Sequence, residues 1–310
     1  MQKVSSNGRN RLIIDSSGFE YKKWTTGETF PVDSCTCNLA NFCNGAFDFH
    51  WHDGPELTVV LRGRMEYLVN DKRYYMEEGD CVFANSGAMH SGSSVDAEEC
   101  IYLVVSFLTG AIDSATDGFF AERFFGGVMD AKAVPSMFFK KGSGEVANLC
   151  TSIHKIINNK EDSWELAVKG LLCQLWQLLY KEAKRHNPVT SERLVPVKRV
   201  KKAIRYMNEH YASRLTLEEV AAVCNLSKSE FCRCFKQITR QTAFEYLMDL
   251  RIRKSLQLLE NDEDLSVTEV ALNCGFFNSS YYTKVFRRYM GCTPREYLRK
   301  RKEEGSSGKK

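Results

Sequence analysis

Residues 265–297, LSVTEVALNCGFFNSSYYTKVFRRYMGCTPREY, decide the fold of the C-terminal part of the chain. The apolar spacing predicts two short helices joined by a tight turn, with Ala271 on the first and Tyr282 and Phe286 on the second. Gly275 suits a left-handed position in that turn. The small residue allows the two helices to pack closely, and the two apolar anchors hold one face of the second helix. The opposite face of the second helix stays free to enter a groove. This pattern is typical of a helix-turn-helix unit.

The same pattern occurs about fifty residues earlier, where Ala221 precedes a turn at Asn225 and the anchors are Phe231 and Phe235. Both helices of this copy are expected to begin with a capping box: Thr216 with Glu219 in the first helix, and Ser227 with Glu230 in the second. The apolar stripe of residues 247–259 predicts a helix that joins the two copies. The sequence therefore predicts an all-α domain over 191–310, with helix-turn-helix units at about 215–237 and 265–290.

This tandem unit resembles the DNA-binding domain of the AraC/XylS family of transcription regulators. The residues that carry the resemblance are Val267, Val270-Ala271, Gly275-Phe276, Ser280-Tyr281-Tyr282, Phe286-Arg287-Arg288, Gly291, Thr293-Pro294 and Tyr297. Three positions depart from the family pattern. Arg240 stands where members often have Gly, Tyr282 replaces a usual Phe, and Leu298 occupies a place that is often basic.

By this resemblance, the N-terminal part of each second helix reads base edges. The matching positions are Ser229, Cys232 and Arg233 in the first copy, and Ser279, Ser280, Thr283 and Lys284 in the second. Arg233 can bind guanine with two hydrogen bonds, whereas Ser and Cys discriminate weakly between bases. Four more basic residues are expected on phosphates: Lys228, Lys236, Arg287 and Arg288. The expected partners are double-stranded operator DNA and RNA polymerase.

The charge distribution agrees with a polyanionic partner for the C-terminal part. Residues 191–310 hold 24 Lys and Arg against 15 Asp and Glu, a net charge of +9, whereas residues 1–190 hold 19 against 24, a net charge of −5. This asymmetry suggests that the N-terminal part has a different task, and a solvated basic surface is the alternative explanation of the C-terminal charge.

Short apolar alternations broken by turn residues predict strands between about residues 35 and 107. Asn70-Asp71 reads as a tight hairpin turn between two of them. Within this region His50, His52, Glu56 and Gly63, followed by Gly79, Asp80, Gly87 and His90, resemble the two sequence boxes of a cupin. Asn85 and Gly45 depart from those boxes. The resemblance implies an all-β cupin-like (double-stranded β-helix) barrel over residues 1–110.

Residues two apart on a strand point to the same side, so His50 and His52 are expected to face the barrel interior. With Glu56 and His90 they make a three-histidine, one-carboxylate set that suits Fe, Mn, Ni or Zn. A metal-dependent cupin enzyme or a metal sensor fused to a DNA-binding domain is therefore the alternative function. Sensor domains of AraC type often keep these residues without a metal, and we predict a regulator that is not an enzyme and needs no cofactor.

The favoured role of the barrel is to hold a small effector, most often a sugar in this family. The candidate effector site comprises His50, His52, Glu56, His90, Trp24 and Tyr67. Aromatic rings there can stack on a sugar, although packing in the core is their commoner role.

Apolar residues at three- and four-residue steps predict helices within residues 145–185. The resemblance implies a helical dimerisation and relay segment over 111–190, and therefore a homodimer, although burial within one chain explains its leucines almost as well. Residues 109–144 show no clear period.

The 310-residue length favours two or three domains, and no apolar run is long enough for a membrane span or a signal peptide. We therefore expect a cytoplasmic protein whose 12 cysteines are reduced. A zinc site at Cys35, Cys37 and Cys43 is an alternative, although no Cys-x-x-Cys pair accompanies them.

Overall fold

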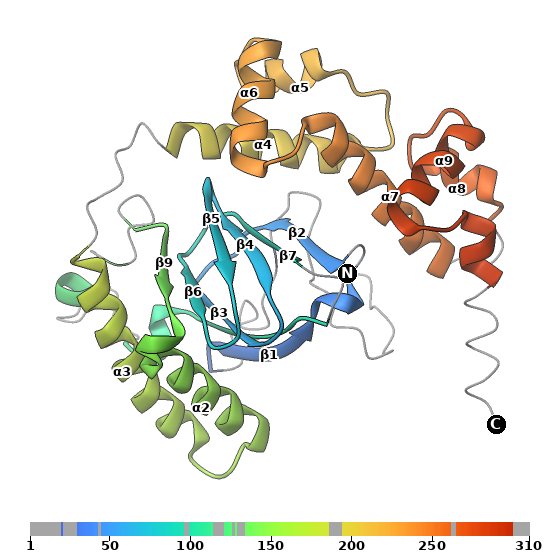
Figure 1. Ribbon diagram of the computed structural model, residues 1–310. Helices are drawn as coiled ribbons and strands as arrows, with labels where there is room; N and C mark the ends of the chain where they lie inside the picture. The colour runs from blue at the N-terminus through green and yellow to red at the C-terminus, as the bar shows by residue number, and fades with distance from the viewer. Residues whose placement is uncertain are drawn as a thin grey trace, which may run out of the picture. The chain divides into compact units, whose positions relative to one another are not determined.

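The structure is a computed structural model that describes residues 20, 30–42, 45–95, 99–113, 121–125, 128, 134–185, 194–261 and 265–299. The chain divides into two compact units, Met1–Val197 and Lys198–Lys310, and each is described by itself (Figure 1). Within the described ranges, no helix combines the length and apolarity that crossing a membrane requires.

The N-terminal unit contains two antiparallel sheets, which confirms the predicted all-β cupin-like fold. The larger sheet has the strand order β1 (Val32–Asn38), β8 (Ile101–Phe107), β3 (Glu56–Arg62), β6 (Cys81–Ala84) and β9 (Ser136–Phe139). The smaller sheet has the order β2 (Ala46–His50), β7 (His90–Ser94), β4 (Met65–Val69) and β5 (Lys72–Met76). Strands distant in sequence are therefore neighbours, and residues from β2, β3, β4 and β7 can meet between the sheets.

The predicted hairpin turn is present, because Val69 pairs with Lys72 and leaves only Asn70 and Asp71 between β4 and β5. Asn70 has a φ of +53°, a left-handed conformation that Asn tolerates. Its backbone N–H donates to the Met89 carbonyl at 2.7 Å, and its side-chain oxygen accepts from the Met89 N–H at 3.1 Å. These bonds tie the turn to the residue just before His90.

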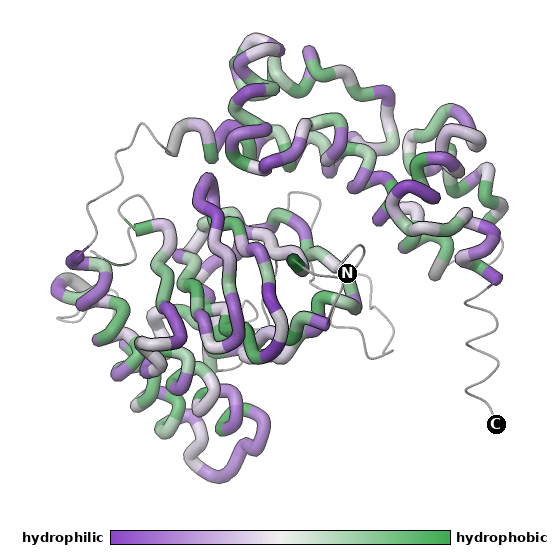
Figure 2. Tube along the Cα trace, viewed as in Figure 1, coloured by the Kyte–Doolittle hydropathy of each residue, from purple (hydrophilic) through white to green (hydrophobic). Residues whose placement is uncertain are grey.

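The larger sheet is buried on both faces. Alternation along β3 directs Val60 into a core shared with the smaller sheet, whereas Leu57 and Val59 belong to a core shared with two helices. These helices are α2 (Glu145–Asn159) and α3 (Trp164–Ala183), and α2 contacts β1, β3 and β8. Both alternate between hydrophobic and hydrophilic residues in Figure 2, as expected for helices with one buried face.

The leucines of α3 are largely explained by this packing. Leu172, Leu175 and Leu179 are fully buried within the unit, and Leu171 and Leu178 are half-buried against the same core. Packing within one chain was the alternative explanation of these leucines, and it accounts for their burial without a second chain.

The segment without a clear period contains short elements: 3₁₀ turns η4 (Thr109–Ala111) and η6 (Lys141–Ser143), the π turn η5 (Ala121–Phe125) and the strand β9. β9 pairs antiparallel with β6. The Asn85 side chain donates to the carbonyls of Val128 at 2.6 Å and Val134 at 2.8 Å. This residue, which replaces the usual cupin proline, thus anchors the chain that leads into β9.

The C-terminal unit is helical, as the sequence predicts. Its helices are α4 (Leu194–His210, whose first residues precede the unit boundary), α5 (Leu217–Val223), α6 (Lys228–Thr239), α7 (Ala243–Asn261), α8 (Val267–Asn273) and α9 (Ser279–Met290). The α5–α6 and α8–α9 pairs are the two helix-turn-helix units, and α7 joins them. Capping boxes start α5, α6 and α8, at Thr216, Ser227 and Ser266.

The second copy is held against the connection between α4 and α5. Gly275, at a φ of +77°, lies so close to this connection that a Cβ would come within 2.6 Å of the Tyr211 carbonyl oxygen. Arg251 of α7 donates to the carbonyls of Tyr211 and Ser213, each at 2.8 Å. Only glycine therefore fits the predicted turn position.

Candidate functional site

Helix α6 presents a polar face opposite its buried anchors. Phe231 and Phe235 are fully buried, with their ring centroids 5.5 Å apart. The predicted contact residues Ser229, Arg233 and Lys236 are exposed, and Cys232 is half-buried. The first copy therefore brings a short polar and basic surface to the start and outer face of one helix.

Helix α9 repeats this arrangement with a different cap. The Asn278 side-chain oxygen accepts from the backbone N–H groups of Ser280 at 2.8 Å and Tyr281 at 3.1 Å. Tyr282 and Phe286 are fully buried and anchor the helix. The predicted contact residues are placed as follows: Ser280, Lys284, Arg287 and Arg288 are exposed, whereas Ser279 and Thr283 are half-buried.

Two of the predicted contact residues already have partners inside the domain. Lys228 Nζ lies 2.7 Å from Glu218 Oε1 in an exposed ion pair, which raises the pKa of Lys228 and lowers that of Glu218. The Thr283 hydroxyl donates to the Ser279 carbonyl at 2.9 Å. A phosphate would therefore compete with Glu218 for Lys228.

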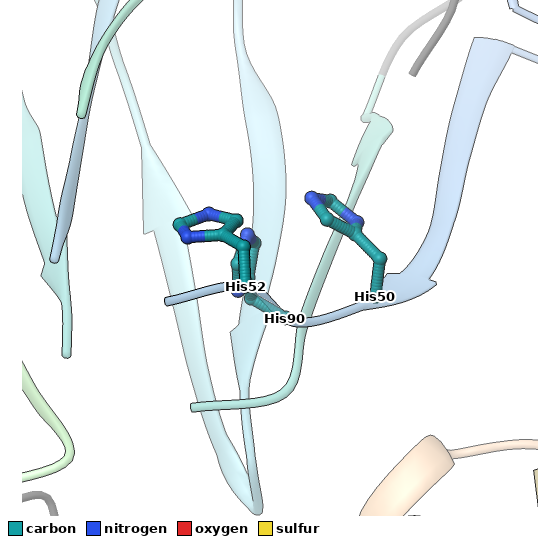
Figure 3. A group of neighbouring side chains, drawn as sticks. All are labelled: His50, His52 and His90. Carbon is teal, nitrogen blue, oxygen red and sulfur yellow. The ribbon is translucent and has the colours of Figure 1, made fainter. Parts of the chain in front are cut away.

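The second candidate site is a buried polar cluster between the two sheets of the N-terminal unit. It brings together His50 at the end of β2, His52 just after it, and His90 at the start of β7 (Figure 3). The His50 and His90 ring centroids are 4.2 Å apart, and those of His52 and His90 are 5.1 Å apart. All three side chains are at most 2 % exposed. Both histidines of the His-x-His pair therefore lie on the same side of the chain, as the spacing of two residues predicts.

The three imidazoles share one hydrogen-bonding pattern. Nδ1 of His50 lies 2.8 Å from the Asp48 carbonyl oxygen, Nδ1 of His90 lies 2.9 Å from that of Ala88, and Nδ1 of His52 lies 3.2 Å from that of Asp53. Because carbonyl oxygens only accept hydrogen bonds, Nδ1 of His50 and of His90 carries the proton. The Nε2 atoms therefore face the cluster.

Glu56, at the start of β3, supplies a carboxylate. Its Oε2 lies 3.0 Å from His52 Nε2, and its Oε1 accepts from the hydroxyls of Thr58 at 3.3 Å and Tyr67 at 3.4 Å. His90 Nε2 is 3.6 Å from the same Oε1. The structure therefore places four of the predicted ligands and Tyr67 around one point, whereas Trp24 lies outside the described residues.

Burial governs the protonation of this cluster. Burial, reinforced by the neighbouring His50, holds the pKa of His90 well below its usual value. Burial and the Glu56 carboxylate raise the pKa of Tyr67 well above its usual value. At neutral pH the His90 imidazole is neutral, and the Tyr67 phenol keeps its proton.

Glu20, which is 6 % exposed beside the histidines, was not among the predicted site residues. Its Oε2 lies 3.6 Å from His50 Nε2 and 4.0 Å from His52 Nε2. No motif or spacing marks Glu20, because it is thirty residues from the His-x-His pair. Its backbone N–H donates to the Trp51 carbonyl at 2.9 Å, and only this tertiary contact reveals it.

The cluster fits a divalent transition metal. Two overlapping sets of donors, each within 4.8 Å of one another, are His50 with His52 and His90, and Glu20 with His52 and Glu56. Imidazole nitrogens and carboxylate oxygens are ligands for Mn, Fe, Ni and Zn, and a bound ion would act as a Lewis acid towards an oxygen ligand. For the alternative zinc site, the Cys35 and Cys37 sulfurs are 3.6 Å apart, and Cys43 lies outside the described residues.

Comparison with known proteins covers both units. The family model "AraC-like ligand binding domain" matches residues 36–176, and the model "Helix-turn-helix domain" matches residues 220–300. The chain is 28% identical over 289 residues to the uncharacterized HTH-type transcriptional regulator YdeC of Bacillus subtilis, covering 92% of this chain and 97% of that protein. It is 26% identical over 260 residues to the HTH-type transcriptional activator RhaS of Klebsiella pneumoniae, covering 81% and 87%. The MmsAB operon regulatory protein of Pseudomonas aeruginosa is 40% identical over 103 residues, 33% of each chain.

Proposed function

This chain belongs to the AraC family of DNA-binding transcription regulators, and from that premise we propose that a small effector in its N-terminal barrel controls binding of its C-terminal domain to operator DNA. The observation that carries the proposal is the duplicated helix-turn-helix unit, in which α6 and α9 each bury two aromatic anchors and expose a polar, basic face. Since the relatives are transcription regulators, we assign no catalytic residue.

We assign base contacts to the N-terminal part of α6 and α9. The residues are Ser229, Cys232, Arg233, Ser279, Ser280, Thr283 and Lys284, with phosphate contacts from Lys228, Lys236, Arg287 and Arg288. The joining helix α7 has 19 residues, so it spans about 28 Å at about 1.5 Å per residue. With the widths of the flanking helices added, this length supports two neighbouring major-groove segments about one turn of DNA apart.

Substitution of Arg233 tests the distinction between base and phosphate contacts. A selected operator is first obtained from a random duplex pool with the full chain. Arg233→Ala is expected to weaken binding to this operator by about 1–3 kcal/mol and to relax the preference at one base position. Lys236→Ala, a matched control on the same helix, should weaken binding to all sequences alike. Equal losses by both variants on specific and non-specific duplexes would refute the role of Arg233, and a pool without enrichment would refute the proposed function.

We propose a carbohydrate as the effector class, bound at His50, His52, Glu56, His90 and Tyr67, with Trp24 as a further candidate. A carboxylate, imidazoles and a phenol within one apolar core supply the donors and acceptors that sugar hydroxyls require. The test is a thermal-shift screen of the full chain against mono- and oligosaccharides, with and without chelator. A ligand at one hundred times its Kd stabilises the folded state by about 2.7 kcal/mol. A screen in which no sugar raises the Tm would remove this effector class.

We further propose that the regulator acts as a homodimer that contacts RNA polymerase. In the described part of α3, Leu166 is the large apolar side chain that is most exposed, at 72 %, and it supports the α2–α3 pair as the dimer surface. Sedimentation analysis of the full chain and of Leu166→Asp tests this arrangement. A monomeric native chain would contradict it.

A further inference from the structure

We propose that the N-terminal barrel binds a divalent transition-metal ion and that Glu20, outside the strands of both sheets, is one of its ligands. The other ligands are Nε2 of His50, His52 and His90 and the carboxylate of Glu56. This inference concerns the same cluster as the proposed effector site, and it rests on the proposed function only in that the ion belongs to a sensor domain.

The donor separations are those of a coordination shell. Two ligand atoms that each lie about 2.1 Å from one ion, at octahedral or tetrahedral angles, are about 3.0–3.4 Å apart. In the structure His52 Nε2 and Glu56 Oε2 are 3.0 Å apart, and the His90–Glu56 and His50–Glu20 pairs are each separated by 3.6 Å. Shifts of a few tenths of an ångström would therefore bring each of these pairs to the separation of two ligands on one ion, and His52 belongs to both donor sets.

The imidazoles are prepared for coordination. Metal-binding histidines generally donate their other ring N–H to a carbonyl or carboxylate, which orients the ring. His50 and His90 use Nδ1 in this way, and Nδ1 of His52 lies 3.2 Å from the Asp53 carbonyl oxygen. His90 Nε2 is fully buried and makes no hydrogen bond to any residue that the structure describes. A buried acceptor without a donor is unfavourable, and a metal ion would satisfy it.

The types of donor select the class of ion. Glu20 and Glu56 place two buried carboxyl groups beside the three imidazoles. This mixture of imidazole and carboxylate donors favours Mn, Fe, Co, Ni or Zn over Ca or Mg.

A metal bond to Glu20 would hold this residue more firmly against the end of β2. Its backbone N–H donates to the carbonyl of Trp51, which lies between the two histidines of the His-x-His pair. A metal bond from the Glu20 side chain adds a second attachment between this residue and the end of β2. We therefore expect the Glu20 amide hydrogen to exchange more slowly when the ion is bound.

The experiment uses the full chain after removal of metals with a chelator. Co²⁺ is titrated and followed by visible absorption, which reports the ligand geometry, and Zn²⁺ and Mn²⁺ are then used as competitors. We expect one ion per chain. Glu20→Gln should raise the Kd at least about tenfold and alter the Co²⁺ spectrum, and Glu56→Gln should do the same. Both variants keep the size of the side chain.

Glu66→Gln is the matched control, because this β4 carboxylate pairs with Arg73 at 3.3 Å away from the cluster. It should leave the Kd and the spectrum unchanged. Hydrogen exchange at the Glu20 amide should slow with metal in the native chain but not in Glu20→Gln, which separates a ligand role from a loss of folding.

Absence of stoichiometric binding for Co²⁺, Zn²⁺ and Mn²⁺ would overturn the metal site. A native Kd in Glu20→Gln would overturn the role of Glu20. Binding of the metal-free chain to its selected operator is measured in parallel, so failure of the metal site is distinguished from failure of the proposed DNA-binding function.

Discussion

At the scale of single residues, Arg240 and Gly291 hold equivalent places at the ends of α6 and α9. Both adopt left-handed backbone conformations, with φ values of +62° and +71°. Each closes its helix with an N–H donated to the carbonyl four residues earlier, that of Lys236 or Arg287, at 2.9 Å. Glycine adopts this conformation without strain, whereas a residue with a Cβ does so at a cost of about 1 kcal/mol. The family departure at Arg240 therefore carries a measurable strain.

Arg240→Gly is expected to raise the free energy of unfolding of the C-terminal unit by about 0.5–1 kcal/mol. Gly291→Ala should lower it by about 1 kcal/mol through backbone strain alone, since nothing lies within 4 Å of the added Cβ. Urea denaturation of the full chain measures both changes. Arg240→Lys is the control, because it keeps the Cβ and should change little. A loss of stability in Arg240→Gly would show that contacts of the arginine side chain outweigh the strain.

At the scale of elements, the helices were predictable because their signals are local. Ser227 with Glu230 and Thr216 with Glu219 are capping boxes in the sequence and in the structure. The predicted family and both fold classes are confirmed. The strand β9 was not predictable, because four residues show no useful period and the strand depends on the edge of β6 and on Asn85.

The same distinction applies to the barrel cluster. His50, His52, Glu56 and His90 could be chosen from the sequence because strand alternation and the cupin-like spacing place them together. Glu20 could not, because its approach depends on a backbone hydrogen bond between residues 31 positions apart. The roles of all these side chains remain predictions, whereas their proximity is observed.

Arg251 is expected to hold the tandem unit together at the element scale. From α7 it donates to two carbonyls in the α4–α5 connection and stacks its guanidinium 5.8 Å from the Phe276 ring centroid at the entry to α9. Arg251→Met keeps the length of the side chain but removes both charge-assisted bonds, so it should lower the free energy of unfolding by about 2–3 kcal/mol.

Urea denaturation of the full chain also measures this change. Arg287→Met, on the exposed face of α9, is the matched control and should change stability by less than about 0.5 kcal/mol while weakening DNA binding. Similar stability losses in the two variants would contradict the anchoring role of Arg251.

At the scale of the whole molecule, the proposed control of DNA binding by an effector has a strict thermodynamic consequence. If the effector changes the affinity for operator by some factor, the operator must change the affinity for the effector by the same factor. The expected coupling is about 5–150-fold, or about 1–3 kcal/mol. Effector affinity is measured by titration with and without saturating operator, and operator affinity with and without saturating effector.

Glu56→Gln should abolish the effector response while leaving operator binding by the effector-free chain unchanged, because Glu56 lies in the barrel cluster and not in α6 or α9. Equal effector affinity with and without operator would mean that the barrel does not communicate with the DNA-binding domain, and the chain would then be a constitutive DNA-binding protein.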